Sequence, residues 1–246
     1  MATTVDIVIP VLNEEVALPA CIEKLFAFTA NHTDRDWRIV VADNGSTDRT
    51  TEIATELAEK YSALSVSRLD QRGRGRALKK VWGESDADVR LYMDVDLSTA
   101  LTALPPLVAA IADDGYEMAI GSRLIKGSEV VDRTLKREIT SRGYNILIHL
   151  FFPQTKFKDA QCGFKAISRN TAENILPLVK DNAWFLDTEL LLLAGKAGYG
   201  IKEVPVHWED DPDTRVKIIA TAWEDVKGLL RLRFKGRPVP PSTLDH

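Results

Sequence analysis

The chain has 246 residues, of which 45% are hydrophobic and 28% charged, and its formal net charge is −4. These ordinary values exclude the disordered, collagen-like and coiled-coil classes, and the weakly acidic balance gives no reason to expect a nucleic-acid partner. The two cysteines, Cys21 and Cys162, provide neither a disulfide framework nor a zinc site and fit a reducing compartment such as the cytoplasm.

The predicted elements of the first half alternate between strand and helix. Short apolar runs predict strands over residues 5–11, 37–42, 64–69, 89–93 and 117–120. Apolar residues at helical spacing predict helices over residues 14–30, 48–60 and 76–82, with Asp48 suited to cap the second of them. Strands that alternate with such helices indicate an α/β fold with a mostly parallel sheet and helices on both faces.

The second half is less regular. Its patterns predict helices over residues 132–152, 185–197 and 218–234 and a strand over residues 203–207. We see neither a linker nor a repeat, so we expect one domain over residues 1–237, with halves of about 1–122 and 123–237. The proline-rich end, residues 238–246, is expected to be a disordered tail.

Polar and charged residues directly follow all five strands of the first half. They occupy residues 13–15, 43–48, 70–76, 94–96 and 121–123. Because ligands of parallel α/β sheets bind at the carboxyl ends of the strands, these segments are expected to form one site. No G-x-G-x-x-G follows the first strand and the sequence has no G-x-x-x-x-G-K-[ST], so the dinucleotide fingerprint and the P-loop are both missing.

Asp94 and Asp96 are candidate metal ligands. The pattern Asp-x-Asp occurs four times and usually marks a solvated loop, but only this pair directly follows an apolar strand. Two carboxylates at this spacing can hold Mg²⁺ or Mn²⁺ together with the phosphates of a substrate. Such a cation would neutralise a diphosphate leaving group.

Together these motifs resemble those of a known family. Residues 10–15 (PVLNEE), 42–48 (ADNGSTD) and 94–96 (DVD) resemble the family 2 inverting glycosyltransferases, which use nucleotide-diphosphate sugars on an A-type fold with a Rossmann-like nucleotide half. Similarity to the polyprenyl-phosphate branch, which includes dolichyl-phosphate glucosyltransferases and dolichol-phosphate mannose synthases, is found in residues 121–123 (GSR), 159–165 (DAQCGFK) and 184–191 (WFLDTELL). The resemblance runs from about residue 5 to 235, and QCGFK at residues 161–165 favours the glucosyltransferases.

The resemblance implies two sets of site residues. The nucleotide-sugar set comprises Pro10, Asn13, Glu14, Asp43, Asn44, Arg74, Asp94 and Val95. In it, Asp43 would accept a hydrogen bond from the base, and Asn44 keeps a polar group but no charge where the family usually has a second acid. The catalytic set comprises Asp96, Asp159 and Arg123, and the metal ligands would be Asp94 and Asp96.

Two of these assignments have plain structural alternatives. Residues 13–15 could cap the first helix, because acids suit the first turn of a helix. Asp187 and Glu189 lie where the family has an acidic pair near the acceptor, but they could equally be surface charges at the start of a helix. Both alternatives stay open.

A basic segment over residues 123–142 suggests an anionic acceptor. The candidate ligands for its phosphate are Arg123, Arg133, Arg137 and Arg142, and a solvated charged helix is the alternative. A polyprenyl phosphate is an anion at neutral pH, so it needs positioning and charge screening rather than a base. Asp159 could then act as a base, or it could orient an arginine or the metal.

Two segments suggest contact with a membrane surface. Residues 146–152 are apolar all round, and residues 218–234 predict an amphipathic helix with a basic end, although packing on the sheet explains either pattern too. The longest uncharged stretch, residues 97–112, contains two prolines and is too short to span a bilayer of about 30 Å. We therefore expect peripheral association with the inner face of a membrane; a separate membrane subunit and a homo-oligomer stay open.

The expected function is the inverting, metal-dependent transfer of a hexose from a nucleotide-diphosphate sugar to a polyprenyl or dolichyl phosphate. UDP-glucose is the first choice of donor by resemblance, while the motifs leave the sugar and the choice between UDP and GDP open. Two alternatives remain: transfer to a saccharide hydroxyl, and a non-catalytic subunit that binds a nucleotide sugar.

Overall fold

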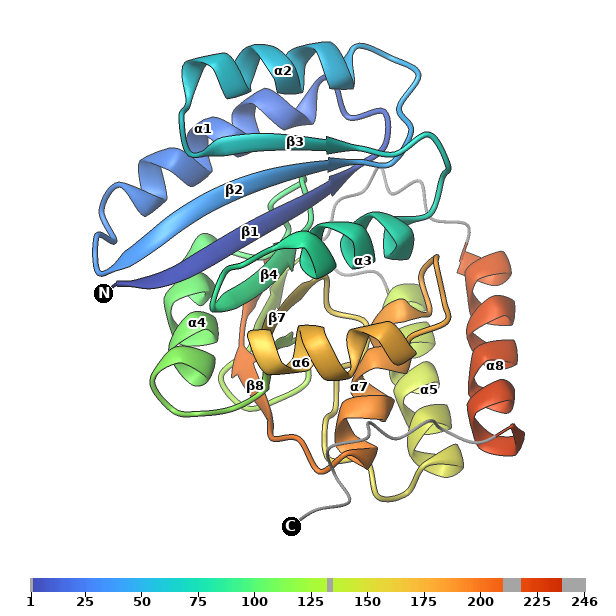
Figure 1. The fold of residues 1–246 in the computed structure, drawn as a ribbon. Helices are drawn as coiled ribbons and strands as arrows, with labels where there is room; N and C mark the ends of the chain where they lie inside the picture. The colour runs from blue at the N-terminus through green and yellow to red at the C-terminus, as the bar shows by residue number, and fades with distance from the viewer. Residues whose placement is uncertain (1, 132–134, 210–217, 236–246) are drawn as a thin grey trace.

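One seven-stranded sheet organises the chain in the computed structural model, which describes residues 2–131, 135–209 and 218–235, apart from the side chains of 135–137 and 218–222 (Figure 1). Its strands are β1 (Thr3–Val11), β2 (Arg35–Asp43), β3 (Leu64–Arg68), β4 (Val89–Met93), β5 (Met118–Ser122), β7 (Phe164–Ser168) and β8 (Ile201–Pro205). They lie in the order β3-β2-β1-β4-β7-β5-β8, and every neighbouring pair is parallel except the two pairs of β7. The predicted mostly parallel α/β sheet is confirmed.

Strand β7 is the main feature of the sheet that the sequence analysis did not predict. It is antiparallel to both β4 and β5, with Phe164 opposite Met93. Because β7 runs against its neighbours, its amino end lies at the edge where β4 and β5 have their carboxyl ends. Residues 159–163 therefore lie at the same edge as residues 94–96 and Arg123.

Helices cover both faces of the sheet. They are α1 (Ala17–Thr29), α2 (Thr50–Lys60), α3 (Arg74–Glu84), α4 (Leu104–Ala112), α5 (Leu135–Phe151), α6 (Arg169–Asn174), α7 (Leu186–Lys196) and α8 (Ile218–Phe234). One core cluster lies under α1, α2 and α4, and the other under the remaining helices (Figure 1). The sequence analysis missed α4 because Pro105 and Pro106 interrupt an apolar run, yet proline suits the first turn of a helix, where its missing N–H removes no helical hydrogen bond.

A separate two-stranded sheet is formed by β6 (Glu129–Val131) and β9 (His207–Glu209), which pair in parallel. The structure thereby corrects the single strand predicted over residues 203–207. Strand β8 ends at Pro205, and β9 begins at His207 in the other sheet. The predicted tail, residues 238–246, lies outside the described residues.

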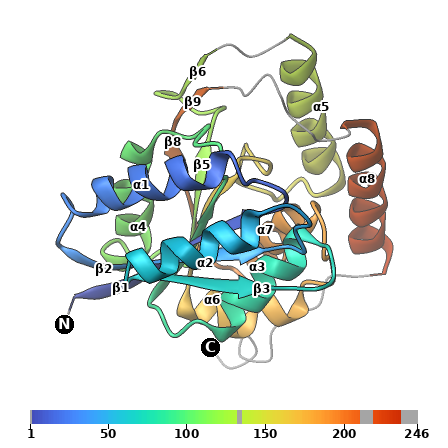
Figure 2. The same ribbon diagram turned by 90° about the horizontal axis from the view of Figure 1, so that it is seen from above.

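Helices α5 and α8 lie side by side at one end of the molecule (Figures 1 and 2). Each has a buried face and an exposed apolar face. The buried side chains are Ser141, Tyr144, Asn145 and Ile148 on α5 and Asp225, Leu229 and Leu232 on α8. The exposed apolar ones are Ile139, Ile146 and Leu150 on α5 and Trp223, Leu230 and Phe234 on α8. Within the described residues, no helix is both long and apolar enough to cross a membrane.

Candidate active site

The loops that follow β1 and β2 are fastened to each other. Asn13, whose backbone is in the left-handed region with φ 57°, donates its N–H to the Ser46 hydroxyl over 3.0 Å. Its side-chain oxygen accepts the backbone N–H of Thr47 at 2.8 Å. Glu14 donates its backbone N–H to the Thr50 hydroxyl over 2.8 Å. These contacts hold two residues of the predicted nucleotide set at the sheet edge.

The alternative that residues 13–15 cap α1 is wrong. Helix α1 begins without a side-chain hydrogen bond and has no acid in its first turn. Instead, the carboxylate of Glu15 accepts the backbone N–H of Arg49 at 2.9 Å, and that of Asp48 accepts the backbone N–H of Thr50 at 3.0 Å. Both acids thus satisfy N–H groups at the start of α2, although Arg49 rather than Asp48 occupies the predicted N-cap position.

Asp43 and Asn44, at the end of β2, have partners inside the protein. The carboxylate of Asp43 is fully buried, accepts a backbone N–H of its own turn at 2.9 Å and the hydroxyl of Thr51, and lies 4.0 Å from Arg68. The side-chain oxygen of Asn44 accepts the backbone N–H of Gly73 at 2.5 Å. A neutral amide oxygen is sufficient for that contact, which connects the loop after β2 to the start of α3.

Arg74, the first residue of α3, joins two carboxylates at the sheet edge. Its guanidinium donates to Asp94 over 2.8 Å and to Asp187 over 3.1 Å, and it stacks over the rings of Tyr92 and Trp184. Burial acts to lower the pKa of Arg74, but the neighbouring Tyr92 and the two carboxylates raise it well above its ordinary value. The group is a fixed cation that balances the charge of Asp94.

Asp187 is buried in a polar network, so the alternative that it is a surface charge is wrong. Its second oxygen accepts the Tyr92 hydroxyl at 2.7 Å and lies 3.3 Å from the ammonium of Lys165, which is itself fully buried. Glu189 is buried as well; it accepts the backbone N–H of Asp181 at 2.8 Å and pairs with Arg231 of α8 at 2.8 Å. Glu189 therefore connects α7 to α8.

Arg123 and Asp159 form a bidentate pair at the end of β5. The two hydrogen bonds from the guanidinium to the carboxylate measure 2.8 and 2.9 Å, and the backbone N–H of Arg123 adds a third of 3.0 Å. Burial acts to raise the pKa of Asp159, but the charge and hydrogen bonds of Arg123 outweigh it and lower that pKa to about 2. The Asp159 carboxylate is therefore ionised, and both of its oxygens already accept hydrogen bonds from Arg123.

Asp94 and Asp96 lie at the bend that follows β4. Asp96 is exposed and accepts the backbone N–H of Ser98 at 2.9 Å, while Leu97 has a left-handed φ of 57°. Gly163 packs against Asp94 so closely that a Cβ there would come within 1.7 Å of the carboxylate. Pro10 and Val95 are partly exposed at the ends of β1 and β4.

The two carboxylates fit a hard divalent cation, because both offer oxygen atoms. Among the residues that the structure describes, no group of three or more His, Cys, Asp or Glu side chains could hold a metal ion. A cation held by Asp94 and Asp96 would therefore need further ligands from a substrate or from water. Mg²⁺ and Mn²⁺ bound through one or two carboxylates and phosphate oxygens have this requirement.

The predicted phosphate ligands are only partly described. Arg123 lies at the sheet edge, whereas Arg142 is exposed on α5 and pairs with Glu138 of the same helix. Arg133 and the side chain of Arg137 lie outside the described residues.

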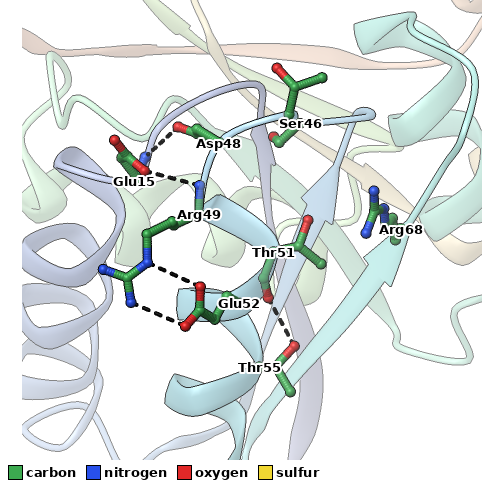
Figure 3. A pocket seen from close by; sticks show the side chains of 9 residues that line it. Glu15, Ser46, Asp48, Arg49, Thr51, Glu52, Thr55 and Arg68 are labelled. Carbon is green, nitrogen blue, oxygen red and sulfur yellow. Dashed lines mark hydrogen bonds and ion pairs between the residues drawn. The ribbon is translucent and has the colours of Figure 1, made fainter.

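Two hollows lie near this edge, and they differ in what lines them. The larger, of about 850 Å³, opens beside α2 and includes Glu15, Arg49 and Arg68, but none of the individual residues predicted to bind the nucleotide sugar, the metal or the acceptor (Figure 3). The smaller, of about 190 Å³, is lined by Arg74, Asp94, Gln161, Trp184, Asp187 and Asp225, among others. We place the candidate active site at the smaller hollow because it contains Asp94, Asp187 and the fixed cation of Arg74.

Sequence reasoning missed three buried polar members of this region, although two of them carry a signal. Lys165 interrupts an otherwise apolar strand, and Asp225 lies four and seven residues before Leu229 and Leu232 on the buried face of α8. A charged residue in a buried register needs a partner or a ligand. Tyr92 carries no such signal, because a tyrosine in a buried strand is ordinary.

The chain is similar to known glycosyltransferases. A profile described as "Glycosyl transferase family 2" matches residues 6–176. Glycosyltransferase AglD of Haloferax volcanii is 37% identical over 220 residues, which make up 87% of this chain but 34% of that protein. Dolichyl-phosphate beta-glucosyltransferase of Dictyostelium discoideum is 27% identical over 242 residues, 94% of this chain and 74% of that protein. The chain thus spans about a third of the first relative and three quarters of the second.

The fold has solved counterparts. The crystal structure of glucosyl-3-phosphoglycerate synthase from Mycobacterium tuberculosis, in complex with Mn²⁺, uridine diphosphate and glucosyl-3-phosphoglycerate, has a TM-score of 0.69 at 19% identity. The match covers 98% of this chain and 82% of that one. At this identity the likeness shows the fold alone, which is the A-type fold of glycosyltransferases.

Proposed function

This chain belongs to glycosyl transferase family 2, and from that premise we propose that it transfers a hexose from a nucleoside-diphosphate sugar to a polyprenyl phosphate at a membrane surface. The observation that carries the proposal is that two charged sites, a pair of carboxylates and an arginine–carboxylate pair, lie at the same edge of the sheet. The carboxylates of Asp94 and Asp96 follow β4, and the Arg123–Asp159 pair follows β5. Only β7 separates these strands, so their ends are about 10 Å apart at the usual strand spacing.

The site formed by Asp94 and Asp96 is assigned to the donor. Asp94 and Asp96 would hold the divalent cation that binds the diphosphate, and Arg74 keeps Asp94 in position. The cation, when bound, neutralises the charge that develops on the departing nucleoside diphosphate. Glucose as the sugar is supported by the names of relatives such as the Dictyostelium enzyme, and UDP with a divalent cation is supported by the Mn²⁺ and uridine diphosphate in the complex of the Mycobacterium enzyme.

The site formed by Arg123 and Asp159 is assigned to the acceptor. Arg123 screens the phosphate of the lipid and points it at the anomeric carbon, while Asp159 orients Arg123. Asp159 is a poor base, since its pKa is about 2 and both oxygens are occupied. A phosphate oxygen forms the new bond to the anomeric carbon as the bond to the diphosphate breaks, and no proton has to be removed. The in-line geometry inverts the anomeric centre.

Membrane contact is assigned to α5 and α8. Nine large apolar side chains are exposed in the described part of the chain, and six of them lie on these two helices. Exposed basic residues accompany them: Arg142 on α5, Lys227 and Arg233 on α8, and Lys235 directly after α8. Apolar and basic groups together match a bilayer that carries anionic headgroups.

The experiment that tests the proposal is a transfer assay with a panel of labelled UDP- and GDP-sugars and a polyprenyl phosphate in detergent. We expect label from one donor in the extracted lipid, at the mass of a polyprenyl-phosphate hexose. Label on an added saccharide instead of the lipid would establish the hydroxyl-acceptor alternative. Nucleotide binding without any transfer would establish a non-catalytic subunit.

A further inference from the structure

The cavity of about 190 Å³ has the size and position of a monosaccharide subsite. It holds the volume of about six waters and is smaller than the roughly 300–1,000 Å³ of pockets for drug-sized ligands. Asp94 is part of its wall, so the cavity adjoins the carboxylates assigned to the diphosphate. The sugar of a nucleotide sugar is bonded to that diphosphate and therefore has this cavity next to it.

Most polar groups of the cavity already have strong partners. Asp94 and Asp187 each pair with Arg74, and Trp184, 46% exposed, stacks against the Arg74 guanidinium. An exposed indole face beside polar groups suits the C–H face of a sugar ring. The carboxyl of Asp225 differs, because no cation pairs with it among the described residues, and the Gln161 side chain that lines the same cavity acts to lower its pKa.

Asp225 is an unusual residue for its place in the fold. Its side chain is 4% exposed and faces inward from α8 in register with Leu229. The groups around it are acids or hydroxyls: Asp181, Asp187, the neighbouring Glu224, and Tyr144 of α5. Burial and the two aspartates raise its pKa to about 7, so that near neutral pH it can donate or accept a hydrogen bond. A buried acid without a cation lowers the stability of the fold. A role in binding would explain why such a residue is present.

We propose that this cavity receives the transferred hexose and that Asp225, together with Gln161, selects the sugar by hydrogen bonding to a hydroxyl whose direction differs between hexose epimers. The inference rests on the proposed function and adds the residues that choose the substrate. An epimer that leaves the buried Asp225 carboxyl without its partner loses about 10- to 100-fold in kcat/KM, as expected for an unpaired buried polar group.

The test compares kcat/KM for UDP-glucose and UDP-galactose in the wild type, Asp225→Asn, Asp225→Ala and Gln161→Ala. Glu84→Gln is the matched control, because Glu84 is exposed at the end of α3 that lies away from the site and pairs with Lys80. We expect the preference between the two donors to fall at least about tenfold in Asp225→Ala and Gln161→Ala, less in Asp225→Asn, and not at all in the control. Melting temperatures show which variants are folded.

Each outcome separates this inference from the proposed function. A wild type that transfers no sugar from any donor contradicts the proposed function and this inference with it. A wild type that transfers both sugars equally, or folded Asp225 and Gln161 variants that keep the wild-type preference, overturn the sugar-selecting role alone. Loss of activity with an unchanged preference likewise indicates a structural role and overturns it.

Discussion

Arg123 and Asp159 illustrate how single residues set the chemistry of the edge. The folded pKa of Asp159, about 2, lies below its ordinary value of 3.8, so ionisation of this group stabilises the fold. That contribution is complete above about pH 4 and is lost as the pH falls through 2. At neutral pH the pair is permanent, so the guanidinium is held in a fixed position.

The first prediction concerns the shape of the Arg123 cation. Arg123→Lys keeps the charge but loses the fork that holds Asp159, so the KM for polyprenyl phosphate should rise by about tenfold or more, while the affinity for the nucleotide sugar stays unchanged. Arg169→Lys is the control, since Arg169 pairs with Asp88 at the opposite edge of the sheet. Steady-state kinetics with each substrate varied in turn measures both KM values. A change in the KM for the donor instead would refute the assignment of Arg123 to the acceptor.

A second prediction follows from the raised pKa of Asp225. Because its folded pKa, about 7, lies above the ordinary 3.8, ionisation of Asp225 destabilises the fold. The stability that it contributes is complete below about pH 4 and is lost as the pH rises through 7. Asp225→Asn should therefore melt increasingly above the wild type between pH 5 and pH 8. A difference in melting temperature that does not change with pH would contradict the cause assigned to the shift.

At the scale of elements, β7 decides which loops reach the site. Its antiparallel direction brings residues 159–163 beside residues 94–96, where Gly163 leaves room for the Asp94 carboxylate. Sequence patterns predicted β4 and α8 with their observed bounds, because a buried apolar run and a long helical spacing are strong signals. They missed β7, because a five-residue run with a lysine at its second position matches no strand pattern, and its burial depends on two distant neighbours.

The same limit applies to the site. The polar residues after β1, β2, β4 and β5 could be placed at one edge from the sequence, since the parallel order of the strands brings them there. The partners could not be predicted. That Asp187 meets Tyr92 and Lys165, and that Asp225 of α8 lines the same cavity as Asp94, follows from packing between segments far apart in the chain.

The third prediction concerns the close contact between β7 and the carboxylates. Gly163→Ala should displace Asp94 and lower kcat/KM by at least about tenfold, because a Cβ has no room there. Gly143→Ala on the exposed side of α5 meets nothing within 4 Å and should instead stabilise that helix by about 0.5–1 kcal/mol. Kinetics and melting curves of both variants provide the comparison. Full activity in folded Gly163→Ala would show that the position of Asp94 is unimportant.

The fourth prediction concerns the outer face of α8. Replacing Trp223 and Phe234, 60% and 78% exposed, by serine should weaken binding to vesicles that contain anionic lipid by about tenfold or more. Val131→Ser on β6 is the control for loss of an exposed apolar side chain elsewhere. Sedimentation with vesicles measures the effect, and added salt should weaken binding further. Equal binding by all three proteins would exclude α8 as the membrane contact.

At the scale of the whole molecule, α8 connects the proposed sugar cavity to the proposed membrane contact. Its inner face contributes Asp225 to the cavity that contains Asp94, and its outer face exposes Trp223 and Phe234. Helix α5, which lies beside α8 (Figure 2), adds further exposed apolar side chains. A lipid acceptor held at these helices would thus have its phosphate near the carboxyl edge of the sheet, where Arg123 lies.

The central claim is that Asp94 and Asp96 bind the donor diphosphate through a divalent cation for transfer to a lipid phosphate. The most direct measurement is the transfer of label from UDP-glucose to polyprenyl phosphate by the wild type and Asp96→Asn, with Mg²⁺, Mn²⁺ or EDTA. The account predicts extracted lipid product only with metal, and about 100-fold less product from the folded variant. Product that is undiminished by EDTA, or equal from Asp96→Asn, would contradict it.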